Sequence, residues 1–261
     1  MIKKIIEFIK NLFKVIDENI EEETIEEVVD KIVIEEPKIE PTEDEKVEKP
    51  IIEQEEEKKV VEVPKTTQKE VYVMLNNKER QTYLKKLGLY TKAIDNIRGS
   101  GQKKAEKIFN TIFLNKSSDS YTEETDKLLR IIYKSYVASA YMVDSDWKYF
   151  KNFSKGEFKC KCKGKGCNGY PSKIHMRTVM LAQYIRNRIN APFGLTSGLR
   201  CKLHNKNVGG VEKSKHLEGR ALDGWGKNKK PADLMKIAKE VPFLNYTYQC
   251  GSSEIHTDIK M

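Results

Sequence analysis

Two histidines and an aspartate near the C-terminal end of the chain carry the residue types of a metal site. His216 and Asp223 are seven residues apart with a glycine between them, a spacing that suits a loop turning into a strand better than one helical face. Farther on, the run Ser-Glu-Ile-His-Thr-Asp alternates as a strand does, which directs Glu254, His256 and Asp258 to one side. Two imidazoles and a carboxylate can then converge.

This ligand set is suited to catalytic zinc. Three protein ligands hold the ion in a tetrahedral site and leave the fourth position open for water. Zinc lowers the pKa of that water to about 7, so that hydroxide is available at neutral pH, and the ion can also polarise a carbonyl group. The residue types therefore suggest a hydrolase with zinc as its cofactor.

The residues around these candidates form a longer pattern, which resembles the zinc D-alanyl-D-alanine carboxypeptidase family, the peptidases of bacterial walls and phage endolysins. The motif Ser-x-His-x-x-Gly-x-Ala-x-Asp is followed near the C-terminal end by His-x-Asp, and further matching residues lie upstream of the motif. The similarity spans residues 145–260 and implies an α+β domain with a small antiparallel sheet. The matching positions are Ser197, Gly198, Arg200, His204, Asn205, Val208, Gly209, Gly210, Ser214, His216, Gly219, Ala221, Asp223, His256 and Asp258.

The resemblance implies a role for each central residue. Arg200 would hold a substrate carboxylate or the oxyanion formed at the scissile carbonyl, because its planar guanidinium fits such groups. Ser214 and Asn205 would join Arg200 in binding the substrate, and His204 would line the cleft. The three zinc ligands would be His216, Asp223 and His256.

The general base does not stand where the resemblance would place it. Several members of the family have an acidic residue three positions before the last histidine, where this chain has Ser253. Glu254 and Asp258 stand two residues before and after His256, and both are on the expected metal-facing side. We favour Glu254 as the base and Asp258 as a partner that orients a metal ligand, and Asp258 is the alternative base.

Four of the five cysteines form a second group. Cys160, Cys162 and Cys167 lie in a loop rich in lysine and glycine, and Cys201 directly follows Arg200. Similar loops occur in clostridial and phage members of the family, so the four cysteines are expected to stabilise the fold. Two disulfides and a four-thiolate structural zinc are both compatible with the spacing. A catalytic cysteine is disfavoured, since no histidine partner is apparent in the sequence.

Four amphipathic helices are predicted ahead of the zinc motif. The last of them contains His175, which is expected to be an ordinary helix residue. Ser120, with Glu123 three residues on, forms a capping-box pattern at the entrance of the third helix. The four helices are predicted over residues 77–87, 102–114, 122–136 and 172–190.

The first three of these helices lie in a segment that resembles the peptidoglycan-binding domain common in wall hydrolases. The likeness covers residues 72–136 and implies wall binding, with peptidoglycan as the partner. Most matching positions are core and turn positions, and Asp95 is expected to form a turn rather than to contact a ligand. The matching residues are Leu84, Leu87, Gly88, Tyr90, Ile94, Asp95, Ile97, Gly99, Ala105 and Phe109.

Charge divides the chain into two parts. Residues 1–70 carry 12 lysines and 22 acidic residues, a net charge of −10, so the remaining 191 residues carry +19. An excess of that size attracts polyanions, among which the teichoic acids of a bacterial wall are candidates. A nucleic-acid partner is not expected, because no recognition motif accompanies the charge. No apolar run is long enough to span a membrane.

Residues 1–70 are predicted to form an amphipathic helix followed by an acidic linker. Apolar residues recur at helical spacing from Ile2 to Ile16, but Glu7 and Lys10 interrupt what would be the apolar region of a secretion signal. Residues 21–69 contain too little apolar surface to fold and are expected to be extended. The helix is expected to dock on a protein, with phage tail proteins as candidate partners of residues 1–35, and a membrane surface is the alternative.

These observations predict an N-terminal arm over residues 1–70, a peptidoglycan-binding-like helical domain over 71–140 and an α+β zinc peptidase domain over 141–261. The hypothesis is a peptidase that cleaves the wall's stem peptide at D-Ala-D-Ala or at an internal bond such as L-Ala-D-Glu. A phage endolysin or a virion-associated lysin is favoured, made in the host cytoplasm without a secretion signal and acting at the cell wall. The rival is a non-catalytic wall-binding or virion structural protein with a structural zinc site.

Overall fold

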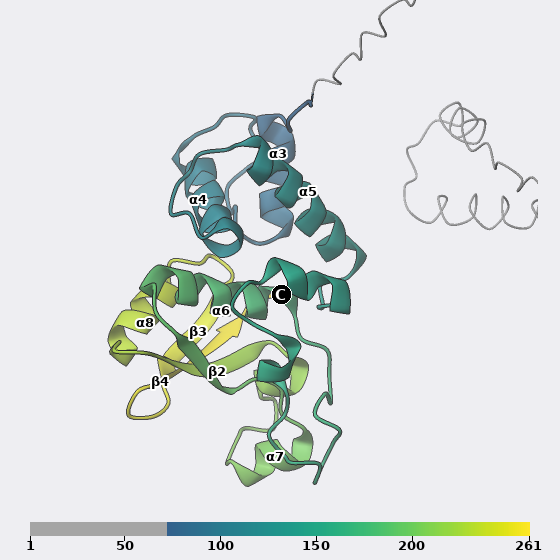
Figure 1. Cartoon of the computed structure of the whole chain (residues 1–261), viewed down its shortest axis with the longest axis vertical. Coiled ribbons are helices and arrows are strands. Elements are labelled where there is room, and N and C mark those ends of the chain that lie inside the picture. The colour runs from purple at the N-terminus through teal and green to yellow at the C-terminus, as the bar shows by residue number, and fades with distance from the viewer. Residues whose placement is uncertain (1–71) are drawn as a thin grey trace, which may run out of the picture. The chain divides into compact units, whose positions relative to one another are not determined.

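Three helices open the described part of the chain, which comprises residues 72–261 of a computed structural model (Figure 1). Helix α3 spans Asn77–Lys86, α4 spans Ser100–Leu114 and α5 spans Glu123–Ala138, each within two residues of the predicted bounds. The likeness of this segment to a peptidoglycan-binding domain stays a prediction, as does the domain boundary at residue 140. The amphipathic helix and acidic linker expected over residues 1–70 lie outside the described residues.

The ends of these helices are set by local hydrogen bonds. At the start of α3, the Asn76 side chain accepts from the Glu79 backbone N–H (3.0 Å) and the Glu79 carboxylate accepts from the Asn76 N–H (2.8 Å), which is a capping box. At α5 the expected capping box of Ser120 is wrong. Thr122 is the N-cap and accepts from the Thr125 N–H, because the Ser120 side chain instead bonds to Ser118.

The second half of the described chain contains an antiparallel sheet with the strand order β1-β2-β4-β3. Helices α6 and α8 pack against the sheet, as Figure 1 shows, and the core residues Leu222, Ile255 and Ile259 belong to this packing. The α+β class is therefore confirmed. The bounds are α6 Met176–Ile189, β1 Phe193–Ser197, α7 Lys202–Asn207, β2 Ala221–Gly226, α8 Pro231–Ala238, β3 Leu244–Gln249 and β4 Glu254–Ile259.

Helix α6 is the central helix of the fold, and it begins later than its sequence pattern predicts. His175 is its N-cap rather than an interior residue, because the imidazole Nδ1 accepts a hydrogen bond from the Arg177 N–H (3.2 Å). Asn190 ends the helix in the left-handed region, with φ of +47°. The apolar side of this segment is buried, and it comprises Ile174, Thr178, Leu181, Ile185 and Ile189.

The N-terminal helices and the sheet share one hydrophobic core, and α6 links them. The Arg177 guanidinium, which is buried, donates to the backbone oxygens of Lys86 and Leu87 at the end of α3 and of Lys260 beyond β4. Asn187 donates to the Thr111 oxygen in α4 (2.7 Å). Polar groups buried in this way are satisfied only while the helices and the sheet stay together.

His175 makes the stability of this fold depend on pH. Burial lowers the pKa of His175 to about 4 from an ordinary value of 6.5, and the nearby Arg177 and Arg220 charges add to the effect. The unfolded chain therefore takes up a proton near pH 6.5 that the folded chain does not. The free energy of unfolding has its full value above pH 6.5 and decreases as the pH drops toward 4. The loss is about 3 kcal/mol at full extent.

We expect His175→Asn, which keeps a capping acceptor but cannot titrate, to remove this component of the pH dependence. The measurement is urea unfolding of both proteins at several pH values between 4.5 and 7.5. As the pH falls, the free energy of unfolding is expected to decrease more for the wild type than for the variant. A difference that is constant over this range would contradict the assignment.

Candidate metal centre

The pairing of β2 with β4 positions two of the three predicted zinc ligands. In this antiparallel register Asp223 lies directly opposite His256. Both side chains project from the face of the sheet opposite to the core residues that pack on α6 and α8, since successive residues of a strand alternate between faces. The strand pairing therefore brings a carboxylate and an imidazole together from positions that are 33 residues apart in sequence.

The third predicted ligand, His216, belongs to the short 3-10 helix Lys215–Glu218 that leads into β2. Gly219 ends this helix with φ of +68°, and a Cβ there would lie 2.0 Å from the backbone oxygen of Lys173. Only glycine satisfies both constraints, which is why the predicted zinc-binding motif needs a glycine between His216 and Asp223.

The three predicted ligands meet in a buried cluster. His216 Nε2 lies 3.2 Å from Asp223 Oδ1, and His256 Nδ1 lies 2.8 Å from the same oxygen. The two ring nitrogens are 3.3 Å apart. His216 is 1% exposed, Asp223 7% and His256 9%, so solvent has little access to the donor atoms.

Hydrogen bonds on the outer side of each imidazole indicate how its protons are placed. His216 Nδ1 lies 2.6 Å from the Gly198 backbone oxygen, which can only accept, so Nδ1 carries a proton and Nε2 is free to act as a ligand. His256 Nε2 lies 3.3 Å from the Asp258 carboxylate, which leaves His256 Nδ1 facing the centre. Metal-binding histidines are commonly oriented by such outer partners.

The resulting donor set fits a divalent cation. With both outer nitrogens protonated, two neutral imidazole nitrogens and one carboxylate oxygen direct unshared electron pairs at the same small space. Such groups repel each other unless a proton or a cation lies between them. Two nitrogens and one oxygen are a ligand set of catalytic zinc, with a fourth position left for water or substrate.

Electrostatics keep the carboxylate of the cluster ionised. Burial raises the pKa of Asp223, but its contacts with His216 and His256 and the charge of Arg200 outweigh burial and hold the pKa well below its usual range. For His256, burial lowers the pKa, whereas the carboxylates of Asp223 and Asp258 outweigh it and raise the pKa above its ordinary value. Protons and a metal ion therefore compete for His256.

Arg200 lies at the edge of this cluster. Its guanidinium pairs with Asp223 Oδ2, the carboxylate oxygen that does not face the imidazoles, and its Nε donates to Ser197 Oγ (2.8 Å). The Arg200 backbone N–H donates to the His216 oxygen (3.1 Å). The predicted cation of the site is thus next to the predicted metal ligands, and its contact with substrate stays a prediction.

The two candidate bases occupy different places. Asp258 accepts from Asn245 Nδ2 (2.7 Å) as well as contacting His256 Nε2, so it lies behind the imidazole and away from the converging donor atoms. Glu254 begins β4 opposite Trp225 and is half-buried. Within residues 72–261 no hydrogen bond joins Glu254 to the ligand cluster, and its role as the base stays a prediction.

The other predicted substrate contacts lie in the loop before the metal motif. Asn205 is buried and donates to the Val211 oxygen (2.8 Å), which braces the loop that leads to His216. Ser214 immediately precedes the helix of His216, and its backbone oxygen accepts from the Leu217 N–H (3.1 Å). Their contact with substrate stays a prediction, as does that of His204.

Two neighbours of the centre were not predicted from the sequence. Tyr248 on β3 is paired with His256, and its ring centroid lies 4.8 Å from the imidazole with 43% of the residue exposed. Asn245, also from the β3 end of the sheet, orients Asp258. The alternation in Leu-Asn-Tyr-Thr-Tyr-Gln is typical of a strand, but only the β3–β4 register shows which of its residues reach the centre.

Two imidazoles and a carboxylate in an α+β domain form a donor set that suits a metallopeptidase centre. Residues 151–258 match the family model described as Peptidase M15, and this range contains the three ligand residues and Arg200. A comparison with curated proteins found no match to the chain. The range is less than half of the 261 residues. For this segment the match supports a zinc peptidase of the M15 family.

Removal of Asp258 tests the orientation of His256. We expect Asp258→Ala to weaken zinc affinity by about 10- to 100-fold, because His256 loses the partner that fixes its outer proton. The measurement is competition with a chromophoric chelator, followed for the wild type, for Asp258→Ala and for Asp233→Ala as a control on an exposed carboxylate of α8. Equal zinc affinities for all three proteins would show that Asp258 does not act on the metal site.

Proposed function

We propose that this protein is a zinc-dependent peptidase that cleaves the stem peptides of peptidoglycan. The proposal rests on one observation, the convergence of His216 Nε2, Asp223 Oδ1 and His256 Nδ1 with their outer hydrogen bonds already made. The match of residues 151–258 to Peptidase M15 supports the same activity class. The bond is D-Ala-D-Ala at the end of the stem peptide, or an internal bond such as L-Ala-D-Glu.

The chain's own residues divide the work around the scissile bond. His216, Asp223 and His256 would hold a zinc ion, which would supply a polarising charge and lower the pKa of a water molecule. Arg200 binds the substrate carboxylate or steadies the negative charge that develops on the carbonyl oxygen. Glu254 accepts the proton of the attacking water and passes it to the leaving amine.

The remaining parts of the chain suggest how the enzyme meets its substrate. The excess of +19 outside residues 1–70 favours an anionic wall, with teichoic acids as additional partners, and this attraction weakens as salt rises. The helices of residues 71–140 are proposed to bind peptidoglycan. We favour a phage endolysin over a virion component, in which residues 1–35 would attach to tail proteins.

A non-catalytic wall-binding protein is the second candidate. It is favoured by Ser253, which stands at the position of the family's acidic residue, and by the lack of a hydrogen bond between Glu254 and the ligand cluster among the described residues. In that case the zinc site would serve the fold only. The two candidates differ in whether wall material is cut.

Digestion of purified Gram-positive peptidoglycan separates them. We expect the wild type to release amino groups or free D-alanine, a chelator to stop the release and added zinc to restore it. His216→Ala is expected to abolish release while the protein still sediments with the wall, because wall binding is assigned to other residues. Mass spectrometry of the products identifies the bond. Sedimentation without release at any pH or zinc concentration would favour the binder.

Replacement of the proposed base tests the catalytic assignment. We expect Glu254→Gln to lower the turnover by about 10²- to 10⁴-fold with zinc still bound, since it removes proton transfer and no metal ligand. Glu212→Gln, on an exposed residue of the loop before the zinc motif, is the matched control and is expected to keep full activity. Full activity of Glu254→Gln would reject Glu254 as the base.

A further inference from the structure

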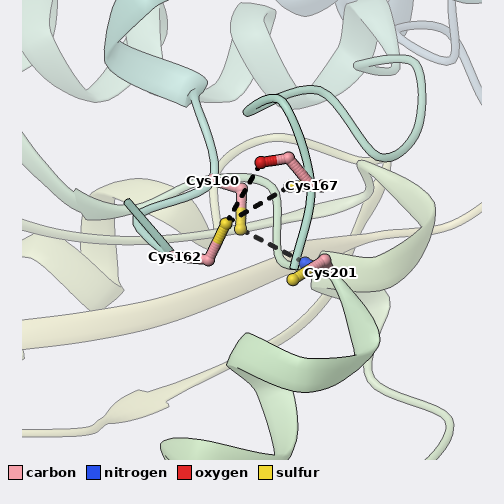
Figure 2. A group of neighbouring side chains, drawn as sticks. All are labelled: Cys160, Cys162, Cys167 and Cys201. Carbon is pink, nitrogen blue, oxygen red and sulfur yellow. Dashed lines mark hydrogen bonds between the residues drawn. The ribbon is translucent and has the colours of Figure 1, made fainter. Parts of the chain in front are cut away.

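The four cysteine sulfurs of the second group meet at one point beside the β1 end of the sheet. Cys160, Cys162 and Cys167 come from the loop after the 3-10 helix Lys155–Phe158, and Cys201 is the N-cap of α7 (Figure 2). All four Sγ atoms lie within 4.8 Å of one another. Four sulfurs around a tetrahedral zinc ion at about 2.3 Å are about 3.8 Å apart, so the cluster has the size of such a site.

We propose that Cys160, Cys162, Cys167 and Cys201 bind a structural zinc ion that clamps the 158–170 loop to the segment carrying Gly198 and Arg200. This ion is separate from the one proposed at His216, Asp223 and His256. Its presence does not depend on whether the enzyme is active.

Backbone N–H groups point at three of the four sulfurs. The Cys201 N–H donates to Cys160 Sγ, the Gly169 N–H to Cys167 Sγ and the His204 N–H to Cys201 Sγ, each at 3.3 Å. Figure 2 shows the first of these bonds as it crosses from one segment to the other. Hydrogen bonds of this kind stabilise sulfur in its ionised form, which is the form that binds metal.

The loop is folded around the sulfurs and not around an apolar core. Between residues 159 and 168 the buried side chains are Cys160 and Cys162, with Cys167 partly buried, and every other residue is exposed. The backbone turns tightly there, with φ of +52° at Lys163 and +81° at Gly164. A loop of this composition buries too little apolar surface to be ordered without a cross-link or a metal.

Charge around the cluster favours a bound dication. The lysines at 159, 161, 163 and 165 are exposed and offset the net charge of −2 that zinc with four thiolates carries.

Disulfides do not account for the arrangement as well as a metal does. Cys162 Sγ and Cys167 Sγ are 3.5 Å apart, and all four sulfurs are unbonded. A disulfide requires about 2.05 Å and joins sulfurs in pairs, whereas here four sulfurs share one centre. Gly166 also lies against the cluster, since a Cβ there would be 2.7 Å from Cys201 Sγ.

Only a few bonds separate the cysteine cluster from the proposed active centre. Cys201 directly follows Arg200, the residue paired with Asp223. The Leu199 N–H donates to the Phe158 oxygen (2.8 Å), and the neighbouring Gly198 oxygen is the acceptor for His216 Nδ1. Fixing the loop to this segment therefore holds in place the two groups that orient His216 and Asp223.

Metal analysis of the full-length protein tests the proposal without an activity assay. We expect two zinc ions per chain in the wild type, one in a His216→Ala and His256→Ala double variant, and one in a Cys162→Ser and Cys167→Ser double variant. Cys250→Ser is the matched control, because Cys250 is exposed and lies outside the cluster, and it is expected to keep both ions. Loss of zinc from the cysteine variant alone, with the histidine variant unchanged, would locate a single zinc at the cysteines and refute the catalytic site instead.

A second measurement uses the wild type, so its result does not depend on whether the cysteine variant folds. In the native wild type we expect one thiol, Cys250, to react with a thiol reagent, and a strong chelator to expose four more. Cobalt substitution is expected to give sulfur-to-cobalt charge-transfer absorption that the histidine variant retains. An intact mass four daltons below the fully reduced value, which marks two disulfides, would overturn the proposal, and so would five reactive thiols before chelation.

Discussion

The register between β2 and β4 is the constraint on which the proposed chemistry depends. It sets Asp223 opposite His256 and turns both to the face of the sheet that the helices do not cover. A shift by one residue would send one of them into the core, because side chains alternate along a strand. The register is held by the opposite face, where Leu222, Ile255 and Ile259 are fully buried. The site and the core are therefore specified by the same strand pairing.

Helix α6 extends this constraint to the rest of the described chain. Its N-cap His175 donates its backbone N–H to the oxygen of Gly219, the glycine between His216 and Asp223. Thr178, one turn on, donates to the same oxygen through its hydroxyl (3.0 Å). The position of the zinc motif is thus tied to a helix that is itself packed between the sheet and α4. The N-terminal helices contribute to the stability of the site although none of their residues reaches it.

Local features of the fold and of the site can be predicted from the sequence, whereas contacts between distant segments cannot. Helical periodicity and short motifs are local, so α3 to α5 and the convergence of His216, Asp223 and His256 could be predicted. Which of two nearby polar residues caps a helix depends on small differences in hydrogen bonding, and the sequence pattern favours Ser120 although Thr122 is the N-cap. Contacts across strands are not local, so the places of Tyr248 and Asn245 beside the centre could not be predicted before β3 was paired with β4.

The two clusters of candidate ligands differ in a way that suits different tasks. Four thiolates fill the coordination sphere of zinc and leave no position for water, so a site of this kind can only hold structure together. Two imidazoles and one carboxylate leave a position open, and the neighbouring Arg200 places a positive charge beside it. Because Gly198 and Arg200 stand just before Cys201 in the chain and contact His216 and Asp223, rigidity at the closed site is transmitted over a few residues to the open one. A loop with little apolar surface can then support a centre whose geometry must be kept to within a few tenths of an ångström.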